Sequence, residues 1–488
     1  MENQLKIKIF SLLILFSFGL NSYGTIWVKN DDEFYVKHLE LSLKDLNSSL
    51  DTTTYPISLE LLKNVSRNSF NEFGKLTNYL TNFKSYSNPY NQEISFFMST
   101  DNNAVRFIDD NRKSKSSFAY SIKFKTKTFA GKLKISREED FLLNKKFFLD
   151  GSHLSFTTVN TIFGIGIFDR WWGPTHDNNL ILSNYARPSP GVFLTSLKGL
   201  EFKNFFNILG KINYSFFINR LESDRHVSKA NLLGGRLTFI PINSLTFGVT
   251  RTLMFGGGGR PNDLNTLWKA IIGQDNVNAA SGEIDPSNQQ AGWDLKYDFN
   301  LGDKLLSTYI QNIGEDGDFG RYFISKEIVT MGLELKYLKQ NLLRSYGIEF
   351  SNTIGDYGLI YNVNYEHYLY QSGYRYRKLP IGAFIDNDSL FLNLKITREI
   401  NKNLRYSTNF FYGKLNRDRS DGGSEFTLGG SSWGTNNSKF VGLKNKVSYS
   451  FTDKLSLEAN LILNDKNLYL LNKKLDKNSF NFYLQYIF

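Results

Sequence analysis

The last ten residues of the chain, 479–488, read Ser-Phe-Asn-Phe-Tyr-Leu-Gln-Tyr-Ile-Phe. In an extended conformation, one face of this segment carries Phe480, Phe482, Leu484, Tyr486 and Phe488. The other face carries Ser479, Asn481, Tyr483 and Gln485. Because successive side chains of a strand point to opposite sides, the alternation predicts a β-strand with one apolar and one more polar face.

The same alternation recurs upstream of this segment. Residues 443–451 and 455–464 alternate in the same way and are joined by the short turn Thr452-Asp453-Lys454. Two further strands, 293–299 and 390–396, are likewise followed by short polar turns. From about Gln92 to the end of the chain, the period stays near two with no helical layer between the strands.

Apolar and polar side chains alternate in this way along the strands of both soluble β-sandwiches and transmembrane β-barrels. A sandwich reaches its full size within about 100 residues. A transmembrane barrel is larger and joins its strands by short turns at one end and long loops at the other. Short turns here alternate with long segments such as 256–291. The fold class is therefore expected to be all-β, an antiparallel transmembrane barrel of roughly 16 to 18 strands over residues 91–488.

The C-terminal segment also resembles the closing strand of bacterial outer-membrane proteins, whose terminal aromatic residue is an assembly signal. The barrel assembly machinery is therefore an expected partner, with Phe488 as the terminal aromatic residue.

Composition excludes several other classes of protein. The 488 residues contain no cysteine, which excludes a disulfide-built scaffold. Aromatic residues make up 15% of the chain and argue against whole-chain disorder. The net charge of +11 leaves three interpretations open: attraction of acidic polysaccharide, contact with lipopolysaccharide phosphates, or a lysine-rich proteome. Nucleic acid is a poor partner for an exported barrel.

The first 24 residues have the composition of a signal peptide. Lys6 and Lys8 precede an apolar stretch at 9–20, and Ser22 and Gly24 are small residues suited to cleavage. We therefore expect export, and the outer membrane of a Gram-negative-type bacterium as the location of the barrel.

Residues 25–90 have a different pattern and predict a small helical subdomain. An apolar stripe with helical spacing runs from Val36 to Leu46, and a second runs from Phe70 to Phe83. Ser69 and Glu72 form a capping-box pattern at the start of the second stripe.

The densest chemical motif is Asp169-Arg170-Trp171-Trp172, followed by Arg187. Paired Trp rings beside charged groups can form a carbohydrate platform, because rings stack on sugar C–H faces and charged groups bind hydroxyls. The alternative is an aromatic belt with a charge pair that fixes a loop, and composition alone slightly favours it.

Two further segments contain candidate binding residues. The glycine run 256–259 precedes Arg260, and residues 264–271, which include Trp268, have helical spacing. We expect this apolar helix to fold into the barrel mouth and plug it. Arg375 and Arg377 alternate with tyrosines and could line the lumen. No spacing in the chain selects a metal site, a cofactor or a catalytic nucleophile.

At these segments the sequence resembles the Wzi-type capsule assembly family of outer-membrane proteins. The resemblance rests on Asp169–Pro174 with Ser183-Asn184 and Ala186-Arg187-Pro188, on Gly257–Pro261 with Leu267-Trp268, on Ile313–Asp316, on Gly373–Arg377 with Pro380-Ile381-Gly382, and on Thr53–Pro56. The chain departs from the family pattern at Thr175-His176 and at Lys378-Leu379.

The resemblance implies an 18-stranded barrel with a periplasmic N-terminal helical subdomain and a mouth closed by loops. It implies a lectin-like, non-enzymatic role in holding capsular or exopolysaccharide at the cell surface, without a cofactor. A sugar-selective, porin-like channel and an outer-membrane hydrolase remain the alternatives. A monomer surrounded by lipopolysaccharide is the expected state.

Overall fold

The computed structural model describes most of the chain: residues 27–28, 33–45, 47, 49–58, 90–102, 105–110, 112–126, 129–202, 204–271, 287–316, 324–419, 431–434 and 439–488. The expected signal peptide (1–24) and the second expected helix (70–83) lie outside the described residues.

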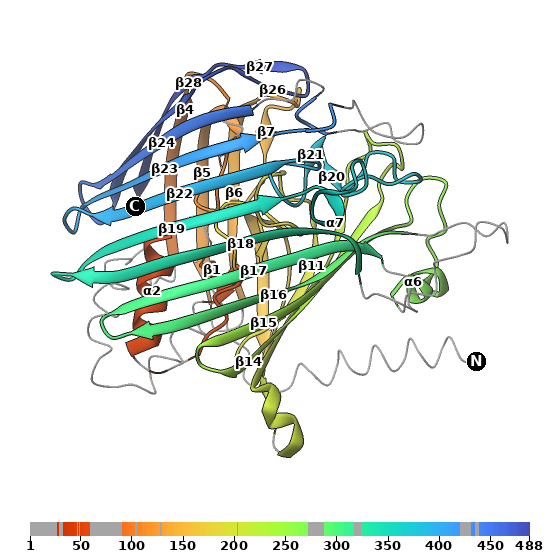
Figure 1. Cartoon of the computed structure of the whole chain (residues 1–488), viewed down its shortest axis with the longest axis horizontal. Helices are drawn as coiled ribbons and strands as arrows, with labels where there is room; N and C mark the ends of the chain where they lie inside the picture. The colour runs from red at the N-terminus through yellow and green to blue at the C-terminus, as the bar shows by residue number, and fades with distance from the viewer. Residues whose placement is uncertain are drawn as a thin grey trace.

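Antiparallel strands form a closed barrel (Figure 1). The wall consists of β4 (Tyr90–Ser99), β5 (Ser114–Lys125), β6 (Phe129–Asp140), β7 (Phe147–Phe148), β8 (Ser152–Thr158), β9 (Thr161–Ile167), β11 (Gly191–Ser196), β12 (Leu200–Glu201), β13 (Lys211–Arg220), β14 (Asn231–Ile242), β15 (Leu245–Phe255), β16 (Ser287–Leu301), β17 (Lys304–Asp316), β18 (Ile324–Lys339), β19 (Leu342–Asn352), β22 (Leu390–Glu399), β23 (Leu404–Lys414), β24 (Lys439–Ser450), β25 (Leu455–Asn464) and β28 (Asn478–Ile487). Within the described residues, β7 and β8 share one wall position against β6, and β11 and β12 share one against β13, which gives 18 positions. The predicted barrel is confirmed.

The last strand closes the barrel as its sequence predicts. β28 pairs with β4, and Phe482 lies opposite Met98 in the register. Phe480 and Phe488 are about half exposed on the outer face, whereas Asn481 is buried on the lumen face. The alternation in the sequence therefore corresponds to a lipid-facing and a lumen-facing side of one wall.

The two ends of the barrel differ. At one end, short turns such as the one between Leu301 and Lys304 join the strands. At the other end, long loops span 100–113, 168–190, 353–389 and 465–477. The smaller elements of the long-loop end are β10 (Trp171–Trp172), α6 (Leu264–Ile271), α7 (Gly355–Gly358), β20 (Arg375–Tyr376), β21 (Leu379–Pro380), β26 (Leu468–Leu470) and β27 (Lys473–Leu475). This asymmetry identifies the long-loop end as the outer mouth.

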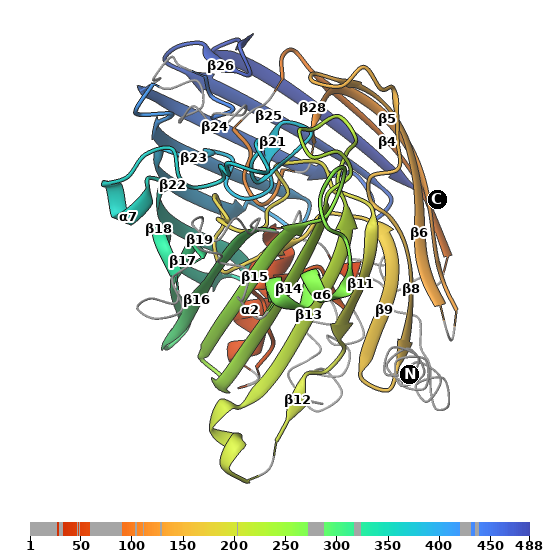
Figure 2. The same cartoon turned by 90° about the vertical axis from the view of Figure 1, so that its right-hand side faces the viewer.

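The N-terminal helix α2 (Glu33–Asp45) confirms the first helical stripe, and it packs inside the ring of strands (Figures 1 and 2). The Nζ of Lys44 donates a hydrogen bond of 2.7 Å to the carbonyl of Gly302, which lies in a short turn. Val36 and Leu39 are buried. The helix therefore lies at the short-turn end and is joined to the barrel wall. The neighbouring chain adds β1 (Trp27–Val28), β2 (Thr54–Tyr55) and β3 (Ile57–Ser58), while the 3-10 helix η1 (Asn204–Leu209) follows β12. Within the described residues, no helix is both long and apolar enough to cross a bilayer.

The loops of the outer mouth fold inward and build a hydrophobic core there. Its large side chains come from four different loops and include Phe107, Trp172, Tyr185, Tyr365, Phe384 and Trp433. All six are at most 2% exposed. Among the described residues, packed side chains thus fill the mouth.

One expectation about these loops was wrong. The helix α6 forms where the spacing predicted it, but it does not enter the mouth. It lies against the outer surface of the wall, because Arg251 on the outward face of β15 donates to the carbonyls of Ala270 (3.1 Å) and Ile271 (2.8 Å). The mouth is already filled by other loops, so the lumen offers this helix no apolar surface.

Candidate functional site

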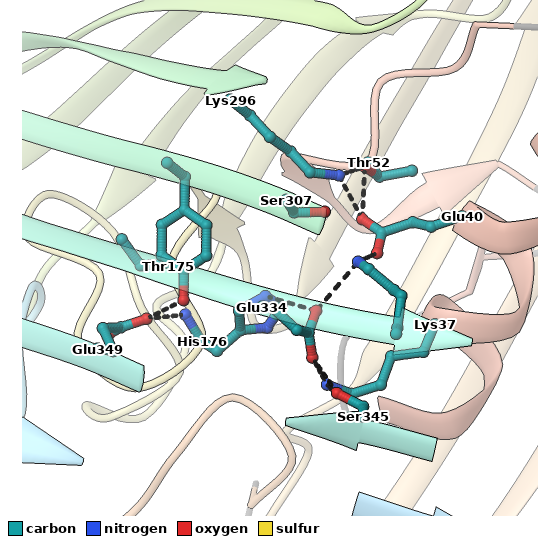
Figure 3. A network of polar contacts seen from close by, with 12 residues as sticks. Lys37, Glu40, Thr52, Thr175, His176, Lys296, Ser307, Glu334, Ser345 and Glu349 are labelled. Carbon is teal, nitrogen blue, oxygen red and sulfur yellow. Dashed lines mark hydrogen bonds and ion pairs between the residues drawn. The ribbon is translucent and has the colours of Figure 1, made fainter. Parts of the chain in front are cut away.

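A buried ionic network joins α2 to the barrel wall (Figure 3). The Glu40 carboxylate accepts from Lys296 of β16 and from Lys336 of β18, and it also accepts from the hydroxyl of Thr52 at 3.0 Å. Lys37 pairs with Glu334 of β18, which Lys336 approaches at 3.0 Å. The side chains of these charged residues are all at most 6% exposed. Breaking a buried pair leaves an uncompensated charge, so the network holds α2 firmly in the lumen.

The outer loop 168–190 descends to the same network. Nε2 of His176 lies 3.6 Å from Oε2 of Glu334. The next wall carboxylate, Glu349, accepts from the backbone amides of His176 (2.7 Å), Asp177 (2.9 Å) and Asn178 (2.9 Å). One carboxylate thereby fixes three consecutive residues of the loop tip, deep in the barrel.

The N-terminal segment and this outer loop also share backbone hydrogen bonds. Strand β10 pairs with β2, and Trp172 lies opposite Thr54. The amide of Gly173 donates to the carbonyl of Thr53 at 2.8 Å. Segments from the two ends of the barrel therefore meet in the lumen. An open polar lumen, as in a porin, is not the arrangement of the described residues.

The paired tryptophans of the central motif are core residues. Trp171 and Trp172 are each 1% exposed. The indole Nε1 of Trp171 donates to the carbonyl of Thr175 at 2.9 Å, and the Trp172 ring lies 5.2 Å from the lumen-facing Phe217. Neither ring is available to stack on a sugar in this arrangement.

The two charged residues beside them also hold the loop. The guanidinium of Arg170 lies 4.5 Å from the ring centres of both Phe168 and Phe217, a cation–π arrangement that places it between the rings. Asp169 forms an ion pair with Lys113 of the neighbouring loop 100–113. Asp169 thus fixes the loop through a charge pair, whereas the two tryptophans are buried inside the mouth and do not form an aromatic belt.

Arg187 and Arg375 are buried in ion pairs. Arg187 bonds Asp140 (2.8 Å), Asp150 (2.6 Å) and Glu138 (2.7 Å), which joins its loop to the end of β6. Arg375 binds Asp386 through Nη2 (2.8 Å) and Nε (3.2 Å) within the loop 353–389. Both side chains therefore brace the mouth.

Three of the nine expected binding residues are accessible at the outer end. Trp268 is 60% exposed on α6. Arg260 is half-buried, 5.6 Å from the Tyr370 ring, and Arg377 is half-buried over Tyr376 at 5.1 Å. The structure does not bring the nine residues into one cluster, because Trp268 lies outside the wall and Arg377 lies in the mouth.

A pocket opens at the mouth among several outer loops. Its lining includes Asn102, Arg106, Lys113, Asp140, Phe141, Tyr185, Arg187, Tyr376, Arg377 and Leu470. Four of these side chains are cationic and one is acidic. The Phe141 ring is half-buried there, whereas the rings of Tyr185 and Tyr376 are 1% and 4% exposed and lie beneath the guanidinium groups of Arg106 and Arg377. Rings combined with charged donors are what sugar recognition requires.

Two cations of this pocket differ from the other two in their partners. Within the described residues no ion pair joins Arg106 or Arg377, whereas Lys113 and Arg187 are paired with carboxylates. Arg106 is 5% exposed and donates to the carbonyls of Tyr185 (2.6 Å) and Arg112 (3.3 Å). Its Nε has no hydrogen-bond partner in the described part of the chain. A buried guanidinium with an unused donor is suited to an anionic ligand.

Burial lowers the pKa of the Arg106 guanidinium, and the nearby Arg187 adds to that effect, although Tyr185, Asp110 and Asp169 oppose it. The guanidinium is therefore desolvated more strongly than these carboxylates compensate. An incoming carboxylate would stabilise the charged form further, in the same direction as Asp110 and Asp169.

Sequence reasoning missed Arg106, Lys113, Tyr185 and Tyr376 as a group. They come from three loops, and no spacing along the chain connects them. The available signal was the charged stretch 105–113, which interrupts the period of two before β5. Among the described residues, no three His, Cys, Asp or Glu side chains gather in a way that could hold a metal ion.

Comparison with known proteins shows a match to a protein family. The family model described as capsule assembly protein Wzi matches residues 99–478. A Klebsiella pneumoniae protein, described as an uncharacterized 55.8 kDa protein in the cps region, is 30% identical over 175 residues. That match covers 35% of this chain and 34% of the relative, so the aligned part is about a third of the relative's length.

A solved structure shares the fold. Escherichia coli Wzi is described as an outer-membrane protein involved in group 1 capsule assembly and as a carbohydrate-binding β-barrel. It superposes with a TM-score of 0.80 at 21% identity, over 94% of this chain and 98% of that one. At this identity the likeness shows a common fold.

Proposed function

Because this chain belongs to the Wzi capsule assembly family, we propose that it binds capsular or exopolysaccharide at the outer mouth of its barrel and anchors it to the cell surface. The role is lectin-like and non-catalytic. The observation that carries the proposal is the pocket among the outer loops, where Arg106 and Arg377 lie beside the rings of Tyr185 and Tyr376.

The chemistry of the pocket favours an acidic sugar. A uronic acid carboxylate could accept charge-assisted hydrogen bonds from Arg106 and Arg377, whose charges no described carboxylate neutralises in an ion pair. The ring of Phe141, which is only half-buried in the pocket, could pack against the sugar C–H faces. A long polymer with repeated acidic sugar units would bind many copies of the protein at once. The polymer would therefore be retained even if each single site bound it with modest affinity.

The fixed position of the outer loop 168–190 inside the lumen supports a binding role over a transport role. Loop 168–190 is fixed from below by Glu349 and by the pairing of β10 with β2. A fixed loop presents a preorganised surface and loses little entropy on binding. We also propose that lipopolysaccharide surrounds the wall and that the barrel assembly machinery recognises β28. The barrel is proposed to be a monomer.

Binding of purified protein to an acidic polysaccharide tests the proposal. We expect Arg106→Ala and Arg377→Ala each to weaken binding roughly tenfold or more, since one charged contact contributes about 1.5–3 kcal/mol. Arg398→Ala is the matched control, because Arg398 is exposed near the short-turn end. Carboxyl-reduced polysaccharide should bind the natural protein as weakly as the acidic polymer binds the variants. Unchanged binding by both variants, with folded barrels, would overturn the proposed site.

Single-channel recording tests the channel alternative. We expect purified protein in a planar bilayer to lack steady porin-like conductance, because α2 and the outer loops occupy the lumen. Stable conductance that a small sugar blocks would favour the sugar-selective channel.

A further inference from the structure

The helix α6 has an exposed apolar flank. Leu264, Trp268 and Ile271 are 81%, 60% and 43% exposed. Positions four and seven residues apart share one face of a helix, so the three side chains form a continuous stripe. In water this stripe would leave a tryptophan and two large aliphatic side chains unburied.

The helix is a fixed element of the outer wall. The Oδ1 of Asp263 accepts from the amides of Asn265 (3.0 Å) and Thr266 (2.9 Å) and caps its first turn. Arg251 binds the carbonyls at its last turn. Ala270 is fully buried. Both ends of α6 are therefore held in place.

The exposure of side chains along β15 shows on which side of the barrel wall α6 lies. Val249 is 43% exposed, whereas Thr250 and Thr252 are each 1% exposed. Since side chains alternate along a strand, Arg251 shares the outward face with Val249. The helix that Arg251 holds therefore lies on the outer surface, just above the apolar side chains of the wall.

A second exposed flank of α6 is polar and consists of Asn265 and Lys269. Seen along the helix axis, the apolar stripe and this polar flank lie on different sides, with Ala270 toward the wall. This division is characteristic of helices at a boundary between lipid and water.

We propose that α6 lies in the interfacial layer of the outer leaflet, with Leu264, Trp268 and Ile271 inserted toward the lipid acyl chains. The partner is the lipid surface itself. The stripe continues the outward apolar side chains of neighbouring strands, such as Val249 and Leu237, which form the membrane-facing belt. A tryptophan at the edge of that belt matches the aromatic girdle of outer-membrane barrels.

The lipid contact also orients an outer loop. The Gly256–Arg260 segment lies between β15 and α6, and the hydroxyl of Tyr370 donates to the carbonyl of Gly256 at 3.2 Å. Arg260 lies 5.6 Å from the same ring. Insertion of α6 therefore sets the height of this loop relative to the membrane. The inference does not depend on the ligand of the mouth.

Site-directed spin labelling tests the location of α6. The chain has no cysteine, so Leu264→Cys and Asn265→Cys each create a unique attachment site. Each labelled protein is placed in bilayers with lipopolysaccharide in the outer leaflet, after heat-modifiability has confirmed a folded barrel. Collisions of the nitroxide with oxygen report lipid, and collisions with a water-soluble nickel complex report water.

We expect the label at Leu264→Cys to collide mainly with oxygen and the label at Asn265→Cys mainly with nickel. Two labels that both collide mainly with nickel would overturn the proposal, because α6 would then lie in water. Labels shielded from both reagents would also overturn it and would indicate that a protein surface, such as a second copy, covers the helix.

Discussion

Nε2 of His176 lies 3.6 Å from Oε2 of Glu334, the carboxylate that also pairs with Lys37 of the N-terminal helix. His176 belongs to a loop of the outer mouth, and Lys37 belongs to a helix at the short-turn end. A single buried carboxylate on the wall is thus shared by segments from both ends of the barrel. Its removal should affect both of them.

We expect Glu334→Gln to loosen α2, because Lys37 and Lys336 would remain buried without this counter-charge. Breaking a buried pair in this way costs about 3–5 kcal/mol. Limited trypsin digestion of the folded barrel should cut near α2 faster in the variant. Glu201→Gln is the control, since the Glu201 side chain is 75% exposed. Equal digestion of the Glu334 variant and the natural protein would argue against a holding role.

Trp172→Ala should reduce the amount of folded protein. Its ring is 1% exposed against Phe217, and truncating such a side chain costs about 3–5 kcal/mol. Heat-modifiable barrel in the membrane fraction measures the effect. Tyr368→Ala is the control, because that ring is 50% exposed on the outer loop 353–389. If Trp172→Ala gave normal barrel levels and shed polysaccharide, the ring would contact the glycan after all.

The outer loops should become less stable as the pH rises. Burial, followed by the neighbouring acids Asp418 and Glu366, raises the pKa of Asp388 to about 8. In the unfolded chain an aspartate has a pKa of about 3.9, so between these values only the folded protein holds the proton. Stability contributed by protonated Asp388 is therefore complete below about pH 4 and is lost progressively up to about pH 8.

Protease digestion of the loop 353–389 between pH 5 and pH 9 measures this dependence. We expect digestion to accelerate with pH in the natural protein, after correction for the activity of the protease. Asp388→Asn cannot ionise and should flatten the profile. A profile that stays equally steep in the variant would assign the dependence to another group.

Deletion of Phe488 should impair insertion into the outer membrane. The residue is 51% exposed, and its amide donates to the carbonyl of Gln92 at 2.9 Å across the closing seam. We expect clearly less barrel in the membrane fraction. Phe410→Ala is the control, because Phe410 is similarly exposed on the wall. Unchanged barrel levels after the deletion would contradict a role for the terminal aromatic residue in assembly.

The sequence by itself determined the barrel and its orientation. The alternation at 479–488 specifies which side chains face lipid, since a strand has a period of two. Turn length specifies which end is outer, and the spacing of Val36, Leu39 and Leu43 specifies a helix. These features depend only on residues that are close together in the chain, so a single sequence is enough to predict them.

Only the tertiary structure decided what the candidate residues contact. Trp172 and Trp268 were both expected to bind polysaccharide, yet one is in the core of the mouth and the other is outside the wall. The pocket unites Arg106 and Arg377, which are far apart in the chain. Barrel closure and loop packing bring such residues together through long-range contacts. The local periodicity of the sequence does not predict those contacts.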